Sequence, residues 1–270
     1  LGVEGGFFES EPNQVLMGTY GYDRLGHALD SCDLNGDGRP ELIATAYLAE
    51  DRAALNRTYG QGAAHIFLGS KDGLFADEPD ASVWGKVLKD GVWTGIENMY
   101  FGTSLVTGDF NGDNQCDFAV GGYNWANDGE GKDGGVFVYS GLESEPYFHA
   151  VYEQTQEYGE FGRSLAVADF DLDGADELVV GAQRGADTTT MTGSAYVFWV
   201  SEQDDPTRTV FADEAEWRMF GDSNYSYFSK GLSTADVSGD GVPDLIISAT
   251  QDEISGGASN TGVTIIMDGS

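Results

Sequence analysis

Acidic side chains recur in four short segments of the sequence with the same internal spacing. Each segment follows the pattern Asp-x-[Asp/Asn/Ser]-x-Asp-x-x-x-[Asp/Glu], so that positions one, three, five and nine carry side-chain oxygens. These positions are Asp33, Asn35, Asp37 and Glu41; Asp109, Asn111, Asp113 and Asp117; Asp169, Asp171, Asp173 and Glu177; and Asp236, Ser238, Asp240 and Asp244. Side chains at this spacing can converge on one point if the chain turns between them, and about six to eight oxygen ligands are what Ca²⁺ prefers. The four segments therefore predict up to four calcium sites.

Two further positions complete each predicted site. Position seven offers its backbone carbonyl oxygen, and the residues there are Arg39, Gln115, Ala175 and Val242. Position six must allow the positive φ that wraps the chain around a cation, and the residues there are Gly38, Asn114, Gly174 and Gly241. Carboxylates this close repel one another without a dication, so an ion-free turn is expected to be strained or mobile. Ser238 makes the fourth ligand set the weakest, whereas Asp171 makes the third the most acidic.

A single cluster of Asp, Asn and Gly also makes an ordinary turn, so the prediction depends on repetition. The segments begin at Asp33, Asp109, Asp169 and Asp236, which gives a period of roughly 65 residues. They are not EF-hands, because no Glu occupies position twelve and short apolar segments rather than helices flank them. Four copies at this period favour cation sites over ordinary turns.

The residues around each acidic segment predict β-strands. In the third copy the apolar stretches 165–167, 178–180 and 195–200 are short, rich in β-branched and aromatic residues, and bounded by Gly or Asp. A fourth strand is predicted before each new copy, around residues 82–88, 147–152 and 209–219. This arrangement is typical of an all-β propeller whose blades have four strands each.

The sequence resembles the FG-GAP repeat family, the propeller repeats of integrin α subunits and of many bacterial secreted proteins. The resemblance rests on the acidic segments, on the Phe-Gly-x-Ser boxes that begin at Phe101 and Phe161, and on the pairs Gly121-Gly122 and Gly181-Ala182. It covers residues 14–267 and implies Ca²⁺ between the first and second strands of each blade. The first and fourth boxes depart from the family pattern at Leu25, Ala28, Ser229 and Gly231.

We expect one domain, residues 1–270, with blades at approximately 21–95, 96–156, 157–222, and 223–270 together with 7–20. The last copy ends near Met267 with no residues left for a fourth strand, while an apolar segment at 14–17 precedes the first copy. The N-terminal strand is therefore predicted to close the ring by pairing into the final blade, because an open ring leaves strand edges unpaired. The alternative is that the four blades belong to a larger, seven-bladed ring like that of integrin relatives.

Composition excludes several classes of function. Lys and Arg number 13 against 46 Asp and Glu, a formal net charge of −33, which disfavours nucleic-acid binding. No apolar run approaches the ~20 residues of a membrane span. Cys32 and Cys116 fit either one bridge or two buried thiols. His27, His65 and His149 fall at unrelated repeat positions and no nucleophile motif is present, so we expect no catalytic activity.

Irregular loops on a repeated scaffold are where recognition is expected. They follow the second strands, at residues 47–62, 123–134, 183–193 and 251–262, and Tyr123 and Trp125 offer aromatic faces for sugars or protein anchors. Aromatic plugs between blades fit these residues equally well. The third box position holds His27, Thr103, Arg163 and Lys230, which suits an anionic ligand, although a solvated rim is the simpler interpretation.

The sequence thus predicts a secreted, cell-surface or periplasmic Ca²⁺-stabilised propeller that mediates adhesion through protein or glycan contacts, without membrane insertion. One alternative is an architectural subunit that self-assembles into a surface layer or filament. A second is the propeller domain, catalytic or not, of a polysaccharide-active enzyme.

Overall fold

A computed structural model describes residues 12–52, 58–89, 92–95, 97–125, 133–152, 159–185, 191–200, 208–222, 226–251 and 261–269. These residues form strands, turns and one short 3₁₀ helix, η1 (Ala212–Glu214), which confirms the predicted all-β class. No helix in these ranges has the length and apolar character required to cross a bilayer.

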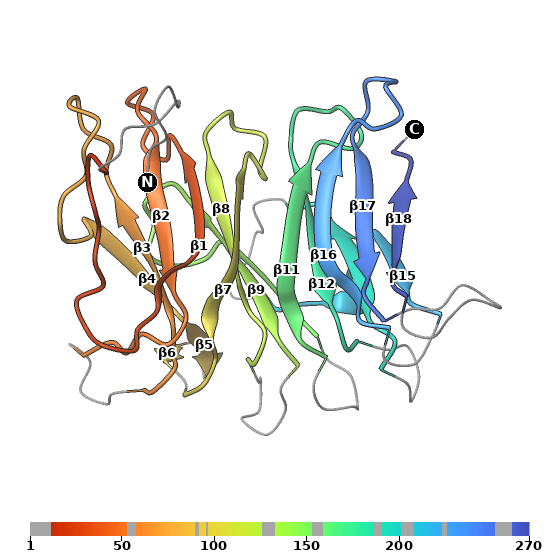
Figure 1. Cartoon of the computed structure of the whole chain (residues 1–270), viewed down its shortest axis with the longest axis horizontal. Coiled ribbons are helices and arrows are strands. Elements are labelled where there is room, and N and C mark those ends of the chain that lie inside the picture. Colours follow the sequence, from red (N-terminus) through yellow and green to blue (C-terminus); the bar gives the residue numbers. More distant parts are fainter. Residues whose placement is uncertain are drawn as a thin grey trace.

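Four antiparallel sheets follow one another along the chain (Figure 1). Blade one contains β1 (Leu25–Cys32), β2 (Glu41–Ala46), β3 (Ala63–Phe67) and β4 (Ala81–Trp84). Blade two contains β7 (Phe101–Gly108), β8 (Asp117–Gly122), β9 (Gly135–Ser140) and β10 (Phe148–Val151). Blade three contains β11 (Phe161–Ala168), β12 (Glu177–Ala182), β13 (Ser194–Phe198) and β15 (Trp217–Phe220). Blade four contains β16 (Phe228–Ala235), β17 (Asp244–Ala249) and β18 (Val263–Met267).

Two features of the sheets were not predicted. A separate hairpin, β5 (Lys86–Lys89) and β6 (Val92–Gly95), lies between blades one and two. The short strand β14 (Val210–Phe211) belongs by sequence to the third blade, yet it pairs in parallel with β10 at the outer edge of blade two. The predicted fourth strand at 147–152 contains β10. The predicted strand at 82–88 overlaps β4 but also runs into β5, and the one at 209–219 overlaps β15 but also takes in β14 and η1.

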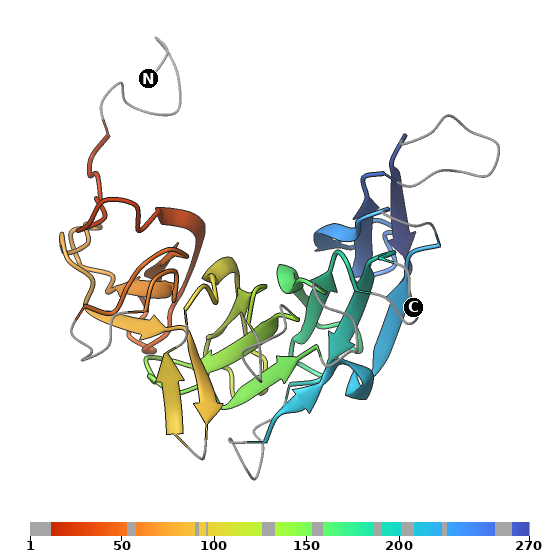
Figure 2. The same cartoon turned by 90° about the horizontal axis from the view of Figure 1, so that it is seen from below.

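The four blades form an open arc, with the first and last sheets at its opposite ends (Figure 2). Residues 14–17, predicted to close the ring, form no strand. The side chain of Gln14 instead bonds to the backbone of Phe75 in blade one, donating at 2.7 Å and accepting at 2.9 Å. In the described part of the chain the predicted pairing into blade four is therefore absent. The physical reason is that blade one has its own apolar outer face, at Leu25 and Leu42, which this segment lies against.

The hydrophobic core lies between successive blades. Alternate residues of a strand point to opposite faces of its sheet, so one strand serves two interfaces. In β12, Leu178 and Val180 pack with residues of blade two, whereas Val179 packs toward blade four. At the ends of the arc this cover is missing, and Leu29 and Ile266 are 61% and 53% exposed. The larger-ring alternative remains a prediction.

The same backbone contact joins each pair of neighbouring blades. A glycine before the third strand forms a parallel bridge with the first box residue of the next blade, in the pairs Gly62–Phe101, Gly134–Phe161 and Gly193–Phe228. The three phenylalanines are at most 1% exposed. In addition, the Ser104 hydroxyl donates to Gly162 O at 2.6 Å, and the Ser164 hydroxyl donates to Ser229 O at 2.5 Å.

A hydroxyl group explains two of the four departures from the family pattern, Ala28 and Gly231. In blades two and three the box serine pairs with a glycine on the second strand, as Ser164 does with Gly181, whose added Cβ would lie 2.2 Å from the serine hydroxyl. In blade four the arrangement is reversed, because Gly231 lies opposite Ser248, which accepts its N–H at 2.9 Å. In blade one the Thr45 hydroxyl likewise accepts the N–H of Ala28, at 2.9 Å.

Close packing at the box glycine gives a testable contrast between two equivalent positions. Gly162 and Gly26 both have positive φ, 79° and 84°, but an added Cβ would lie 2.4 Å from Gly135 O at the first and meets nothing within 4 Å at the second. We expect Gly162→Ala to lower the free energy of unfolding by about 3 kcal/mol and Gly26→Ala by about 1 kcal/mol. Both variants place an alanine at positive φ, but only Gly162→Ala also crowds its neighbours. Urea unfolding of the two variants measures this difference, and equal losses would contradict the interface.

Candidate calcium turns

The four acidic segments lie side by side along one edge of the arc, at the top of Figure 1. Each forms the turn between the first and second strands of its blade, as predicted: β1 to β2, β7 to β8, β11 to β12, and β16 to β17. We call them turns one to four. Position six has positive φ in every turn, at Gly38, Asn114, Gly174 and Gly241.

All four turns share one hydrogen-bond pattern. In turn three, Asp169 accepts the N–H groups of Asp173 at 3.1 Å and Gly174 at 3.0 Å, and Asp173 accepts the N–H of Ala175 at 2.9 Å. The equivalent bonds recur in turns one, two and four. The backbone of each turn therefore wraps around the carboxylates at positions one and five. The N–H of position seven donates one of the hydrogen bonds that hold this conformation.

The position-nine carboxylates are buried beneath the turns. Glu41, Asp117, Glu177 and Asp244 are at most 4% exposed. Three of them accept a backbone N–H from the start of the same turn, at 2.8 Å from Leu34, 2.7 Å from Phe170 and 2.7 Å from Val237. Asp117 instead accepts from the Tyr147 hydroxyl at 2.7 Å, and its Oδ1 is buried without a hydrogen-bond partner.

Burial raises the pKa of two of these carboxyl groups. The pKa of Glu177 rises to about 7, mainly through burial, and repulsion from Asp171 and Asp169 adds to it. Burial likewise raises the pKa of Asp117 to about 6, against the lowering effect of the Tyr147 hydroxyl. Negative charge is therefore costly at Glu177 and Asp117, and a cation at either turn would offset that cost.

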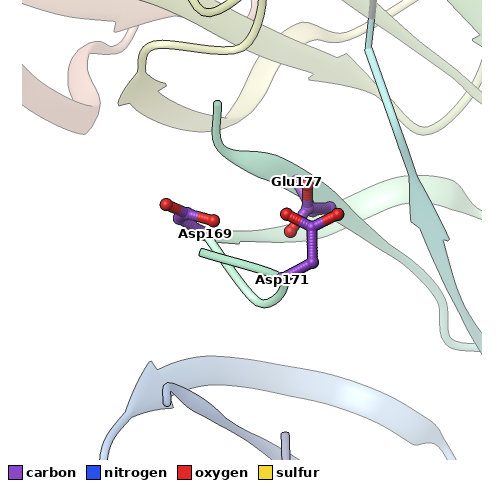
Figure 3. A group of neighbouring side chains, drawn as sticks. All are labelled: Asp169, Asp171 and Glu177. Carbon is purple, nitrogen blue, oxygen red and sulfur yellow. The ribbon is translucent and has the colours of Figure 1, made fainter. Parts of the chain in front are cut away.

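In turn three, three carboxylates converge (Figure 3). One oxygen each of Asp169, Asp171 and Glu177 lies within 4.8 Å of the others. Two ligands of a Ca²⁺ ion, each at about 2.3–2.6 Å from it, lie at most about 5 Å apart, so the three oxygens fit one ion. In the other turns position three is neutral, Asn35, Asn111 or Ser238, and the corresponding trio contains only two carboxylates. The donor set is all oxygen throughout, which suits Ca²⁺.

Neighbouring turns are joined across the blade interfaces. Asp176 and Asp109 exchange two hydrogen bonds, at 2.7 and 2.8 Å, which tie turn three to turn two. Cys32 and Cys116 form a disulfide with a Cα–Cα distance of 6.2 Å. Cys32 directly precedes Asp33 of turn one, and Cys116 directly precedes Asp117 of turn two. The disulfide therefore joins two candidate ion sites in different blades.

The two predicted ligand-binding aromatics have different environments. Tyr123 is half-buried at the edge opposite to the turns, where its ring lies under the guanidinium of Arg163 at 4.1 Å. Trp125 is 3% exposed and packs edge-on against Phe137 in the core between blades one and two. Trp125 therefore fills the space between two blades, which was the alternative to ligand binding in the sequence analysis. Parts of the predicted recognition loops, 53–57, 126–132, 186–190 and 252–260, lie outside the described residues.

The sequence interpretation missed several residues beside Tyr123. Tyr100, Glu160 and Tyr227 each directly precede a box, and all have positive φ, between 51° and 56°. Arg184 lies within the predicted recognition loop 183–193, as the second residue after β12, whereas Tyr123 is the first residue after β8. The sequence could have indicated them, because each lies at a similar position relative to one of the boxes. Equivalent positions in successive blades lie at the same edge of the arc.

Comparison with known proteins agrees with this geometry. A family model described as "FG-GAP repeat" matches residues 25–67 and 161–198, which hold turns one and three with their flanking strands. The chain carries FG-GAP repeats. Turns two and four lie outside the matched residues, but they share the hydrogen-bond pattern of the matched FG-GAP copies.

The chain is similar to proteins of two kinds. It is 28% identical over 231 residues to the phosphatidylinositol-glycan-specific phospholipase D of Mus musculus, across 83% of this chain and 26% of that protein. It is 31% identical over 224 residues to integrin alpha-PS2 of Drosophila melanogaster, across 79% of this chain and 14% of that protein. The chain thus spans about a quarter or less of the length of these relatives.

Among solved structures, a rhamnogalacturonan lyase of Bacillus licheniformis overlaps 80% of this chain and 38% of its own, with 19% identity and a TM-score of 0.47. Similarity at this level does not identify a shared function.

Proposed function

We propose that this chain is a calcium-stabilised recognition module that works outside the cell. Its four turns bind Ca²⁺ through positions one, three, five and nine together with the carbonyl of position seven, and the ions hold the blades in register. The opposite edge and the loops beside it then meet a protein or glycan partner. This role suits the similarity to an integrin α subunit, and the disulfide suits an oxidising compartment.

One observation carries the calcium proposal. The convergence of Asp169, Asp171 and Glu177 within 4.8 Å places three carboxylates together with no Lys or Arg among them, and one of the three is buried. Like charges at this separation disfavour the ion-free turn, and a dication reverses the sign of that contribution. Because the other turns repeat the same backbone pattern, the proposal extends to four ions.

A second function is favoured by the phospholipase D relative, in which a matching segment occurs within an enzyme. In that case the chain would be the propeller part of a larger enzyme and would position it on a substrate surface. Calcium binding by the turns is common to both functions.

Metal analysis of purified protein tests the ion sites. After equilibration with excess Ca²⁺ and removal of free ion, we expect up to four bound ions per chain. Asp171→Asn/Glu177→Gln should lower this number by one, because it removes two of the three converging carboxylates. Asp213→Asn/Glu214→Gln, which removes the same charge from the exposed helix η1, should leave the number unchanged. Equal ion numbers in both double variants would contradict the assignment of turn three.

A further inference from the structure

A row of tyrosines and cations crosses blades two to four at the edge opposite to the calcium turns. Its members are Tyr100, Tyr123, Arg163, Arg184, Tyr227 and Lys230, and we call it the tyrosine–cation stripe. Each residue lies within the first three positions of a first strand, directly before one, or just after a second strand. Because the turns lie at the other ends of the same strands, the stripe and the turns occupy opposite edges of the arc.

Ring and charge contacts run along the stripe from one blade to the next. The rings of Tyr100 and Tyr123 lie 5.5 Å apart, and the Arg163 guanidinium stacks over Tyr123 at 4.1 Å. On the blade-four side, Arg184 and Lys230 lie 5.9 and 6.0 Å from the Tyr227 ring. Both arginines also pair with one acid, Glu160, at 3.8 Å from Arg163 and 3.5 Å from Arg184.

Among the residues that the structure describes, the stripe gathers positive charge in a very acidic chain. Three of the 13 Lys and Arg residues meet here, and within the described ranges the carboxylate paired with them is that of Glu160, whereas the whole chain carries −33. The side chains of Arg163 and Arg184 keep 39% and 36% of their surface exposed, while that of Glu160 keeps 13%. The acid is therefore mostly covered, whereas more than a third of each arginine side chain stays exposed. A guanidinium stacked on an aromatic ring still presents its N–H groups to a carboxylate or a sulfate.

Backbone N–H groups in the stripe are already used in hydrogen bonds within the chain. The N–H groups of Arg163, Arg184 and Lys230 already donate to Glu160 O, Gly159 O and Tyr227 O, each at 3.2 Å. A peptide added as a strand depends on such main-chain groups, so this mode of recognition is disfavoured. Half-buried tyrosine rings beside cations instead suit sugar rings that bear acidic groups.

We propose that the tyrosine–cation stripe binds an acidic glycan. The cations pair with carboxylate or sulfate groups, and the half-buried tyrosine rings contact the sugar rings between them. The inference rests on the proposed function, of which it names the partner class, and it uses residues far from the ion ligands.

Binding of defined oligosaccharides in saturating Ca²⁺ tests the proposal. The probes are a hyaluronan octasaccharide, which bears carboxylates, a heparin octasaccharide, which also bears sulfates, and maltooctaose as the neutral control. We expect at least one acidic probe to bind, more weakly as salt increases, and maltooctaose not to bind. Arg163→Gln/Arg184→Gln/Lys230→Gln should weaken binding at least tenfold. Lys71→Gln/Lys86→Gln/Arg208→Gln, which changes the net charge equally at other surfaces, should bind as the unaltered chain does.

Three outcomes would overturn the proposal: no binding of either acidic probe, equal binding by the stripe variant and the unaltered chain, or equally strong competition by polyglutamate, which would indicate an acidic protein segment as the partner. Metal analysis on the same samples separates the two proposals. A chain that binds calcium but no acidic sugar loses only this inference, whereas a chain that binds no calcium loses the proposed ion sites whatever the sugars do. The melting temperature of each variant in Ca²⁺ shows whether a loss of binding reflects a loss of fold.

Discussion

Removal of calcium is expected to lower the melting temperature of this chain by more than about 10 °C. The turns are formed only in the folded chain, so ion binding adds directly to the free energy of unfolding. An ion present at about 100 times its dissociation constant adds about 2.7 kcal/mol per site, and a chain of this size gains about 2–4 °C per kcal/mol. Thermal unfolding followed by circular dichroism, in Ca²⁺ and in EDTA, measures the effect.

The calcium prediction has two controls. Returning Ca²⁺ after chelation should restore the melting temperature, and Mg²⁺ at the same concentration should restore less of it, because Mg²⁺ demands a smaller octahedral site. Asp169→Asn/Asp171→Asn/Glu177→Gln should show a smaller difference between Ca²⁺ and EDTA than the unaltered chain. Identical melting curves in Ca²⁺ and EDTA would remove the metal assignment altogether.

Loss of the Cys32–Cys116 disulfide is expected to destabilise the chain by about 4.5 kcal/mol. The bridge closes a loop of 84 residues, and the loop-entropy relation gives about this value at 25 °C. Because the bridge also connects turns one and two, Cys32→Ser/Cys116→Ser should reduce the calcium affinity of those turns as well as the stability. Unfolding by urea in saturating Ca²⁺ gives the change in stability, and calcium titration of the folded variant gives the change in affinity.

Chemical reduction provides the matching control for the disulfide. The unaltered chain treated with a reductant should unfold at the urea concentration of the double variant, and the reductant should not affect the variant itself. The intact mass should rise by about two hydrogens on reduction. Two free thiols in the untreated chain, or a double variant as stable as the unaltered one, would show that the bridge does not contribute.

The pattern of neighbouring residues in the sequence determined the repeated strand–turn–strand units of this protein. The spacing from Asp169 to Glu177, the glycine or asparagine at position six, and the alternation of short apolar runs with turn residues all act within about ten residues. Carboxylates at positions one and five satisfy nearby backbone N–H groups, and Gly38 and Asn114 adopt a positive φ within their own turns. The all-β class, the strand–turn–strand units and the positions of the turns could therefore be predicted from the sequence.

Contacts between blades decided the rest, because they depend on which surfaces the arc brings together. Spacing alone could not pair Cys32 with Cys116, since their approach depends on how blade one packs against blade two. The same packing buries Trp125 as a plug, draws β14 onto blade two, and aligns the tyrosine–cation stripe from residues that share only their distance from a box. The N-terminal segment has the composition of a closing strand, yet it lies against blade one, where apolar residues were otherwise uncovered. Local pattern thus determined each blade and its turn, whereas burial between blades determined how the blades are joined and which side chains stay at the surface.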